Sequence, residues 1–286
     1  MKFPTSLAFI ISLVALLPTV HGAPGHIALA DWSITGVPST GLTDVTFPLT
    51  IVEADHISGY YFAQMFSFAG STSRRGYIGL QPRPNQDGNP VLHATFSNFI
   101  TGSTTDDPNC HDGADGGDGT SCFVEWNGVH GRRYDLEVKY AGLGTQRWVG
   151  TVIDTVTKAR VHIGSYTLPA DAAGIQGSEL SFVEWYLWNV DPPPSTDRCA
   201  HLPYQKTIFG TPRTTHAGSV GALSVFYGVE DCVGMVALHS ENVATGVETN
   251  SGFHGQAGFV ELALVGNDNV SALGGSRYPS YVQVIN

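Results

Sequence analysis

Short strand-like segments recur along this chain roughly every ten residues, and no helical segment separates them. Thirty-four glycines and sixteen prolines punctuate the 286 residues, whereas stretches rich in Leu, Ala, Glu and Lys are hard to find. Regularly spaced short strands are typical of sandwiches and jelly rolls. The sequence therefore predicts an all-β protein, an antiparallel two-sheet β-sandwich of the jelly-roll kind.

The expected strands cover residues 26–35, 45–52, 59–68, 75–81, 91–100, 132–140, 146–157, 159–168, 180–189, 206–209, 221–227, 233–239, 258–265 and 281–285. Segments 82–90 and 101–121 are expected to be loops. A proline run at 192–194 suggests an internal joint over residues 191–204. The piece that follows is small for an independent β domain, so residues 23–286 are predicted to form one domain.

The first residues have the features of a signal peptide. Lys2 precedes a short apolar run at 7–17, Pro18 ends that run, and small residues precede Ala23. The run is too short to cross a bilayer, so residues 1–22 are predicted to be removed and the mature protein to be secreted. Asn269 begins an N-glycosylation sequon, which is consistent with secretion.

The charge of the chain limits the kinds of partner that it can bind. A formal net charge of −11, a pI of about 5.3 and the lack of a basic run argue against a nucleic-acid or anionic-membrane partner. We expect a monomer.

Secretion makes the four cysteines candidates for disulfides. Four cysteines allow three pairings. The favoured arrangement joins Cys110 to Cys122 across a Gly-rich segment and leaves Cys199 to pair with Cys232.

Two near-copies of one motif, 123–126 and 182–188, each place a glutamate between large apolar residues. Side chains alternate along a strand, so Glu184, Tyr186 and Trp188 are expected to share one face. In the first copy, Glu125 and Asn127 lie together in the same way. A buried carboxylate is unfavourable unless it is hydrogen-bonded or used, so both glutamates are candidate functional residues.

A face that mixes carboxylates, amides and aromatic rings suits sugars, because rings stack on a pyranose while polar groups bind its hydroxyls. The sequence therefore predicts recognition of an extracellular polysaccharide on a concave sheet face. The candidate binding residues are Gln64, Tyr60, Tyr186, Trp188 and Asn127. Structural alternatives remain: Gln64 as a satisfied core amide, and each glutamate at a strand end or paired with an arginine such as Arg133 or Arg147.

Two other functions fit the same residues. An enzyme could use Glu184 and Glu125 as a catalytic pair; carboxyls about 5 Å apart suit retaining glycoside hydrolysis, and roughly 6.5–9.5 Å suits inversion. A polysaccharide lyase would need a Tyr or His base and a group that neutralises a uronate. A secreted effector or toxin with a protein partner would instead expose an apolar patch.

The segment 106–118 is rich in aspartate and glycine, and oxygen-rich flexible loops bind calcium. Asp112, Asp115 and Asp118 are the candidate ligands. The spacing does not match an EF-hand, and the alternative is an acidic loop pinned by a disulfide without metal. No cofactor is expected, with calcium as the alternative.

The order of several motifs resembles a family of secreted sandwich domains of unknown function found in actinobacteria and filamentous fungi. The matching segments are 77–81, 113–122, 131–134, 148–155, 163–165 and 182–186 ahead of Cys199, within about residues 45–205. The resemblance implies a jelly-roll-like fold and a link to polysaccharides. It supplies no catalytic residue.

Overall fold

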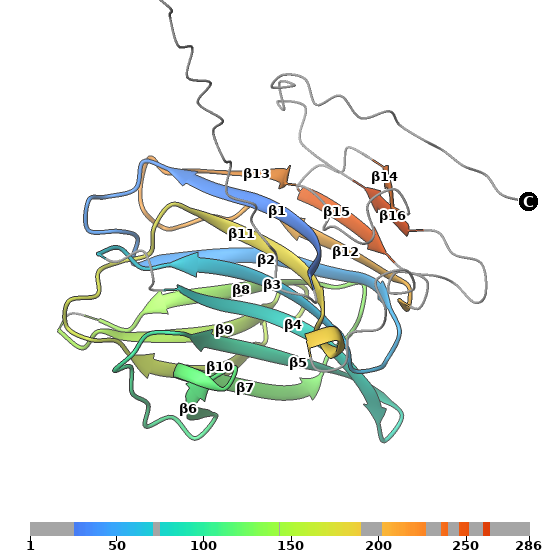
Figure 1. Cartoon of the computed structure of the whole chain (residues 1–286), viewed down its shortest axis with the longest axis horizontal. Helices are drawn as coiled ribbons and strands as arrows, with labels where there is room; N and C mark the ends of the chain where they lie inside the picture. The colour runs from blue at the N-terminus through green and yellow to red at the C-terminus, as the bar shows by residue number, and fades with distance from the viewer. Residues whose placement is uncertain are drawn as a thin grey trace, which may run out of the picture.

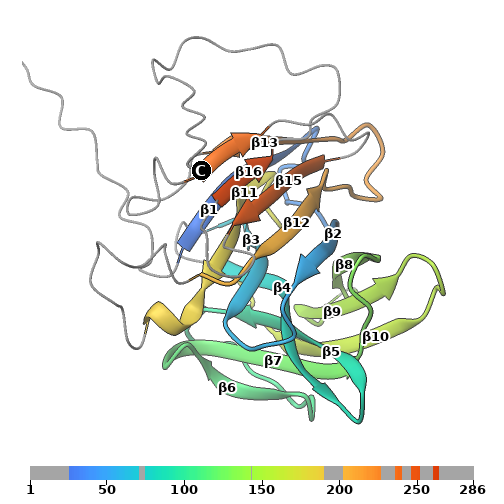
Figure 2. The same cartoon turned by 90° about the vertical axis from the view of Figure 1, so that its right-hand side faces the viewer.

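The computed structural model describes residues 26–70, 75–142, 144–189, 202–226, 236–239, 246–251 and 260–263. These residues form strands β1 to β16 and one short 3-10 helix, η1, with no α-helix in the described ranges. Two antiparallel sheets pack face to face, as Figures 1 and 2 show. The predicted all-β sandwich is confirmed.

The larger sheet has eight strands in the order β13 (Val220–Phe226), β1 (His26–Thr35), β11 (Ser178–Trp185), β3 (Tyr60–Ser67), β4 (Arg75–Gln86), β5 (Asn89–Asn98), β7 (Gly117–Asn127) and β6 (Cys110–Ala114). The second sheet has six strands in the order β10 (Arg160–Thr167), β9 (Arg147–Asp154), β8 (Arg133–Tyr140), β2 (Asp44–Ala54), β12 (Gln205–Gly210) and β15 (Gly246–Ser251). Two short strands, β14 (Val236–His239) and β16 (Val260–Ala263), pair in parallel.

The main hydrophobic core lies between the two large sheets. Phe62 and Phe96 come from the eight-stranded sheet, Phe47 and Trp148 come from the six-stranded sheet, and all four are almost fully buried. Side chains alternate between the faces of a strand, so each of these strands has its other face turned away from the core. That second face of the eight-stranded sheet carries the candidate site.

Two expected loops are partly strand. β4 continues through Pro82 and Pro84 to a two-residue turn at Asp87 and Gly88, where φ is 49° and 77°. The segment 101–121 likewise contains the β6–β7 hairpin, whose turn has Asp115 with φ of 49° followed by Gly116 with φ of 77°. Hairpin turns with two positive φ angles favour Asp-Gly. These dipeptides were the sequence signal for both hairpins.

The expected strand 180–189 ends earlier than predicted. β11 stops at Trp185, and residues Tyr186–Asn189 form the 3-10 helix η1. The rule that side chains alternate between the two faces of a strand therefore does not apply to residues 186–189.

The disulfide between Cys110 and Cys122 is present and joins the paired strands β6 and β7, as predicted. Cys199, Cys232, Asn269, the signal-peptide residues and most of the joint at 191–204 lie outside the described residues.

Candidate functional site

A second, smaller apolar cluster lies on the eight-stranded sheet, separate from the main core. Its buried members are Leu29, Tyr61, Ala63 and Phe182. We call the surface on which it lies, turned away from the six-stranded sheet, the outer face. Tyr61 and Ala63 alternate with the core residues of β3, which explains why their side chains lie here.

Five side chains form a row across this outer face. Glu184 on β11 lies opposite Tyr61 on β3. The β3–β4 register places Gln81 next to Tyr61. Gln81 then lies opposite His93, which lies opposite Glu125 on β7. Directly opposed residues in antiparallel strands project to the same face, and we call these five residues the transverse row.

Glu184 is the buried acid of the transverse row. It is 8% exposed and accepts a hydrogen bond of 2.7 Å from Asn189 Nδ2. Burial raises the pKa of the Glu184 carboxyl and the negative charge of Asp115 raises it further, although the Asn189 hydrogen bond acts in the opposite direction. Glu184 therefore keeps its proton to higher pH than an ordinary glutamate.

Two tyrosines lie beside Glu184. The Tyr61 hydroxyl lies 2.5 Å from Thr95 Oγ1, and Tyr77 donates a hydrogen bond of 3.2 Å to Asp115 Oδ1. Burial raises the pKa of both phenols. Both hydroxyls are thus protonated at ordinary pH, so each is a hydrogen-bond donor and not a base.

Arg83 organises the other end of the row. Its Nε lies 3.2 Å from Glu125 Oε1, its Nη2 donates to Gln81 Oε1 at 2.5 Å, and its Nη1 lies 3.5 Å from the Tyr186 hydroxyl. His93 Nδ1 lies 3.0 Å from the same Glu125 oxygen. The network joins strands β4, β5 and β7 to the 3-10 helix η1.

This network sets the charge of Glu125. Burial raises the pKa of the Glu125 carboxyl, but contacts with His93 and Arg83 outweigh it, and the net shift is downward. Burial and the charge of Arg83 lower the pKa of His93. Glu125 is therefore an ionised hydrogen-bond acceptor, in contrast to Glu184.

Phe123 is an exposed aromatic ring on the same face. It lies two residues before Glu125 on β7 and is 48% exposed. Its ring stacks on the His93 imidazole with centroids 5.2 Å apart and planes 12° apart. His111 also contacts the Phe123 ring edge-on, with centroids 6.4 Å apart, and about half of the side chain stays exposed.

The structure does not place three predicted site residues on this face. Gln64 is 1% exposed, lies in the interior and accepts a hydrogen bond from Ser181, whereas no group among the described residues bonds its Nε2. It is a core amide, as its alternative predicted, but only its oxygen is satisfied. Tyr60 is also buried and donates to the Pro203 carbonyl. Trp188 packs into the main core because η1 replaces the end of the strand. The expectation that these three side chains line the binding face is corrected.

Glu184, Glu125 and Tyr186 do share the outer face, and Asn127 is exposed further along β7. The arginine partner of Glu125 is Arg83, whereas Arg133 and Arg147 contact Asp135 and Asp106 respectively.

Sequence reasoning missed Gln81, Arg83 and His93. The signal for the first two was the period of two from Tyr77 through Gly79 to Arg83, which the prolines on either side of Arg83 concealed.

Glu184 and Glu125 do not form a catalytic pair. Four strand spacings separate them in the transverse row, which amounts to about 19 Å along the sheet. Both glycosidase geometries require carboxyls closer than about 10 Å. The expectation that the two glutamates act on one glycosidic bond is corrected.

The three candidate calcium ligands are used separately. Asp115 accepts from Tyr77, Asp118 accepts from Thr101, and Asp112 is exposed. Among the described residues, no group of three or more His, Cys, Asp or Glu side chains is arranged to hold a metal ion. The calcium hypothesis gains no support from this hairpin.

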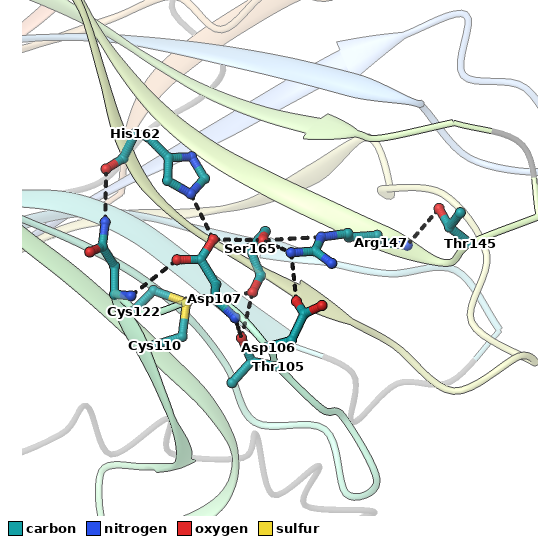
Figure 3. A network of polar contacts seen from close by, with 10 residues as sticks. Thr105, Asp106, Asp107, Cys110, Cys122, Thr145, Arg147, His162 and Ser165 are labelled. Carbon is teal, nitrogen blue, oxygen red and sulfur yellow. Dashed lines mark hydrogen bonds and ion pairs between the residues drawn. A yellow bond between two sulfur atoms is a disulfide. The ribbon is translucent and has the colours of Figure 1, made fainter.

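A second polar cluster, outside the outer face, surrounds Asp107 (Figure 3). Asp107 Oδ2 accepts hydrogen bonds from His162 Nε2 at 2.7 Å and Ser165 Oγ at 2.8 Å, and Arg147 donates to Ser165 Oγ. In a hydrolase triad the histidine lies between serine and aspartate, whereas here the aspartate occupies the middle. Ser165 is also buried. The cluster ties the segment before β6 to the six-stranded sheet.

No family model matches the sequence, and no curated protein matches it. Solved structures that match this chain include scytalido-glutamic peptidase with a transition state analog inhibitor, at 11% identity and a TM-score of 0.40, covering 72% of this chain and 89% of that one. SCP-B, a member of the Eqolisin family of peptidases in complex with a tripeptide, matches at 11% identity and a TM-score of 0.39. The match covers 72% of this chain and 88% of that one. The PL-14 alginate lyase from Aplysia kurodai matches at 10% identity and a TM-score of 0.27, covering 58% of this chain and 70% of that one. Similarity at this level carries no functional conclusion.

Proposed function

We propose that the outer face of the eight-stranded sheet binds an extracellular glycan. The observation that carries the proposal is the transverse row, which aligns Glu184, Tyr61, Gln81, His93 and Glu125 across the face. Gln81, His93 and Glu125 are at least partly exposed, whereas Tyr61 and Glu184 are buried. The Gln81 amide, the His93 imidazole and the Glu125 carboxylate along one line can hydrogen-bond successive sugar hydroxyls. Charge-assisted hydrogen bonds to a carboxylate are the stronger kind.

Phe123 gives this surface an apolar contact for a sugar ring. Its exposed ring lies next to the Glu125–Arg83 ion pair, so one sugar could stack on Phe123 while its hydroxyls reach Glu125. The Tyr186 hydroxyl lies near Arg83 and extends the same end of the surface. Asn127 lies further along β7 as an additional amide.

The Cys110–Cys122 disulfide supports a place outside the cell, because disulfides persist in oxidising environments. No helix in the described ranges has the length and apolar character needed to cross a membrane.

The test is retention of the purified protein on a panel of insoluble or gel-embedded polysaccharides. Phe123→Ala should weaken retention by about tenfold, because a stacking aromatic contributes about 1.5 kcal/mol. Glu125→Gln should weaken it through the lost carboxylate acceptor. Val156→Ala is the matched control, since Val156 is 67% exposed in the β9–β10 turn. Equal retention of Phe123→Ala and Val156→Ala would refute the proposal.

A second function is favoured by one observation, the raised pKa of Glu184. A carboxyl that keeps its proton can act as a general acid on a bound glycan. Glu184→Gln distinguishes the two functions: it removes the transferable proton but leaves a hydrogen-bonding side chain. Binding alone should survive the change, whereas release of reducing ends or unsaturated uronates by the wild type should be lost.

A further inference from the structure

A cleft of about 520 Å³ opens in the eight-stranded sheet near β1, β11 and β13, away from the transverse row. The register between strands brings its polar lining together. Asp31 on β1 lies opposite Leu180 on β11 and Ser224 on β13, and Ser33 lies opposite Ser178. The cleft is thus built on three adjacent strands whose backbones are hydrogen-bonded.

The two carboxylates of the cleft are in different situations. Glu179 has a cationic partner, because its carboxylate lies 3.2 Å from Arg75 Nε, and it also accepts a hydrogen bond from Ser67. No hydrogen bond or ion pair reaches the Asp31 carboxylate from the part of the chain that the structure describes. Burial raises the pKa of Asp31, as expected for a carboxylate without a compensating cation. The cleft therefore holds one uncompensated negative charge.

The rest of the lining is suited to a hydroxylated ligand. Ser33, Ser178 and Ser224 line the cleft together with Asp31, and Gln176 adds an amide. Each hydroxyl can both donate and accept. A ligand that complements these groups carries one positive charge and several hydroxyls, which is the chemistry of a protonated amino sugar.

The cleft lies on the same strand as one end of the transverse row, because Leu180 lines the cleft and Glu184 belongs to the row. Leu29 and Phe182 pair directly between the Asp31–Leu180 pair and Glu184. Along β11, Leu180 and Glu184 are four residues apart, a distance of about 13 Å. A short oligosaccharide can span that distance.

We propose that this cleft binds the free ammonium group of an amino sugar in a glycan that lies along the outer face. The proposal rests on the glycan-binding function above and names its class of ligand: a polysaccharide with unacetylated amino groups. The net charge of −11 favours such a cationic polymer over a uronate polymer.

The experiment is a calorimetric or NMR titration of the whole protein with glucosamine, N-acetylglucosamine and glucose. Glucosamine should bind at least about tenfold more tightly than the other two, because a charge-assisted hydrogen bond contributes about 1.5–3 kcal/mol. Asp31→Asn should abolish that preference, and Ser224→Ala should weaken binding severalfold. Asp87→Asn, at the exposed β4–β5 turn, is the matched control.

Several outcomes would overturn the proposal. These are equal affinity for the three sugars, an unchanged preference in Asp31→Asn, or equal binding of lysine methyl ester, which would show that the cleft reads an ammonium group without the sugar. Retention of neutral polysaccharides that depends on Phe123, without a preference for glucosamine, would refute the amino-sugar assignment and leave the glycan-binding function intact. Binding of glucosamine that depends on Asp31, with no polysaccharide retained, would support the cleft and refute the function proposed for the transverse row.

Discussion

Glu184 and Glu125 lie on the same face of one sheet, with strands β3, β4 and β5 between them. The two carboxyls are in opposite electrostatic environments. Burial raises the pKa of Glu184, whereas His93 and Arg83 hold that of Glu125 below its usual value. The two copies of the motif thus contain glutamates whose pKa values are shifted in opposite directions.

The first prediction concerns stability as a function of pH. An acid whose folded pKa is raised contributes stability that is fully present below its unfolded pKa and is lost as pH rises through the folded pKa. Glu184 has an ordinary value of 4.5. Above that pH the wild type should lose stability, because Glu184 ionises at a buried position. Glu184→Gln cannot ionise, so the variant should not show this loss. Thermal melting across the acidic and neutral range measures the difference.

Glu125→Gln is the matched variant for that experiment, with the opposite sign. The folded pKa of Glu125 is lowered, so its contribution is present above the unfolded pKa and is lost as pH falls. If both variants changed melting in the same direction at neutral pH, the assignment of two different environments would be wrong.

A second prediction tests the packing beneath Tyr61. A Cβ atom at Gly79 would lie 2.3 Å from the Phe62 carbonyl oxygen and 2.7 Å from Tyr61 Cε2. Gly79→Ala should displace the Tyr61 ring, break its contact with Thr95, and destabilise the fold by about 1–3 kcal/mol. Urea unfolding measures the change.

Gly117→Ala is the control for Gly79→Ala. A Cβ at Gly117 meets its nearest neighbour, the Ala114 carbonyl oxygen, at an ordinary 3.5 Å. A shift in the urea midpoint as large for Gly117→Ala as for Gly79→Ala would show that general backbone effects, and not the Tyr61 contact, cause the loss.

The third prediction concerns the cluster around Asp107. Burial raises the pKa of Asp107, but hydrogen bonds from His162, Ser165 and the Asn109 backbone amide give a net lowering. Its contribution is present above the unfolded pKa and is lost as pH falls through the folded pKa. Asp107→Asn should reduce stability at neutral pH and flatten the acid side of the curve, as measured by chemical unfolding between about pH 2 and pH 7.

Asp112→Asn, at an exposed aspartate of the β6–β7 hairpin, is the control for that measurement. An equal change in both variants would indicate a general effect of net charge.

The fourth prediction concerns the disulfide. The Cys110–Cys122 bond closes a loop with a sequence separation of 12. A loop of this size restricts the unfolded chain by about 3 kcal/mol. The double change Cys110→Ser and Cys122→Ser should lower the free energy of unfolding by about that amount, and an unchanged urea midpoint would contradict the account.

The spacing of strand-like segments was sufficient to predict the sandwich, because the alternation of apolar residues selects strands and the lack of helical periods excludes other layers. The pairing of Cys110 with Cys122 followed from their positions on either side of a Gly-rich segment, which the structure shows to be a hairpin. Local sequence rules also placed Glu125 and Asn127 on one face. These features depend on neighbours in the chain.

The transverse row could not be found in this way. Gln81, His93 and Glu125 are neighbours because of strand register, and register depends on pairings between segments distant in sequence. The sequence could not show which face of β3 turns inward, so Gln64 was expected beside Glu184 although it lies in the interior. Trp188 differs from its expected position for another reason: β11 ends at Trp185, so Trp188 is not part of the strand.

The sequence alone therefore determined the class of fold, the hairpin disulfide and the two glutamate motifs, because these arise from local periodicity and turn chemistry. The tertiary structure decided that Arg83 and His93 contact Glu125 and keep it ionised, that Glu184 stays buried beside Tyr61, and that Asp31 lines a cleft without a cation among the described residues. Such contacts depend on strand order and on burial, which only the packed sheets define.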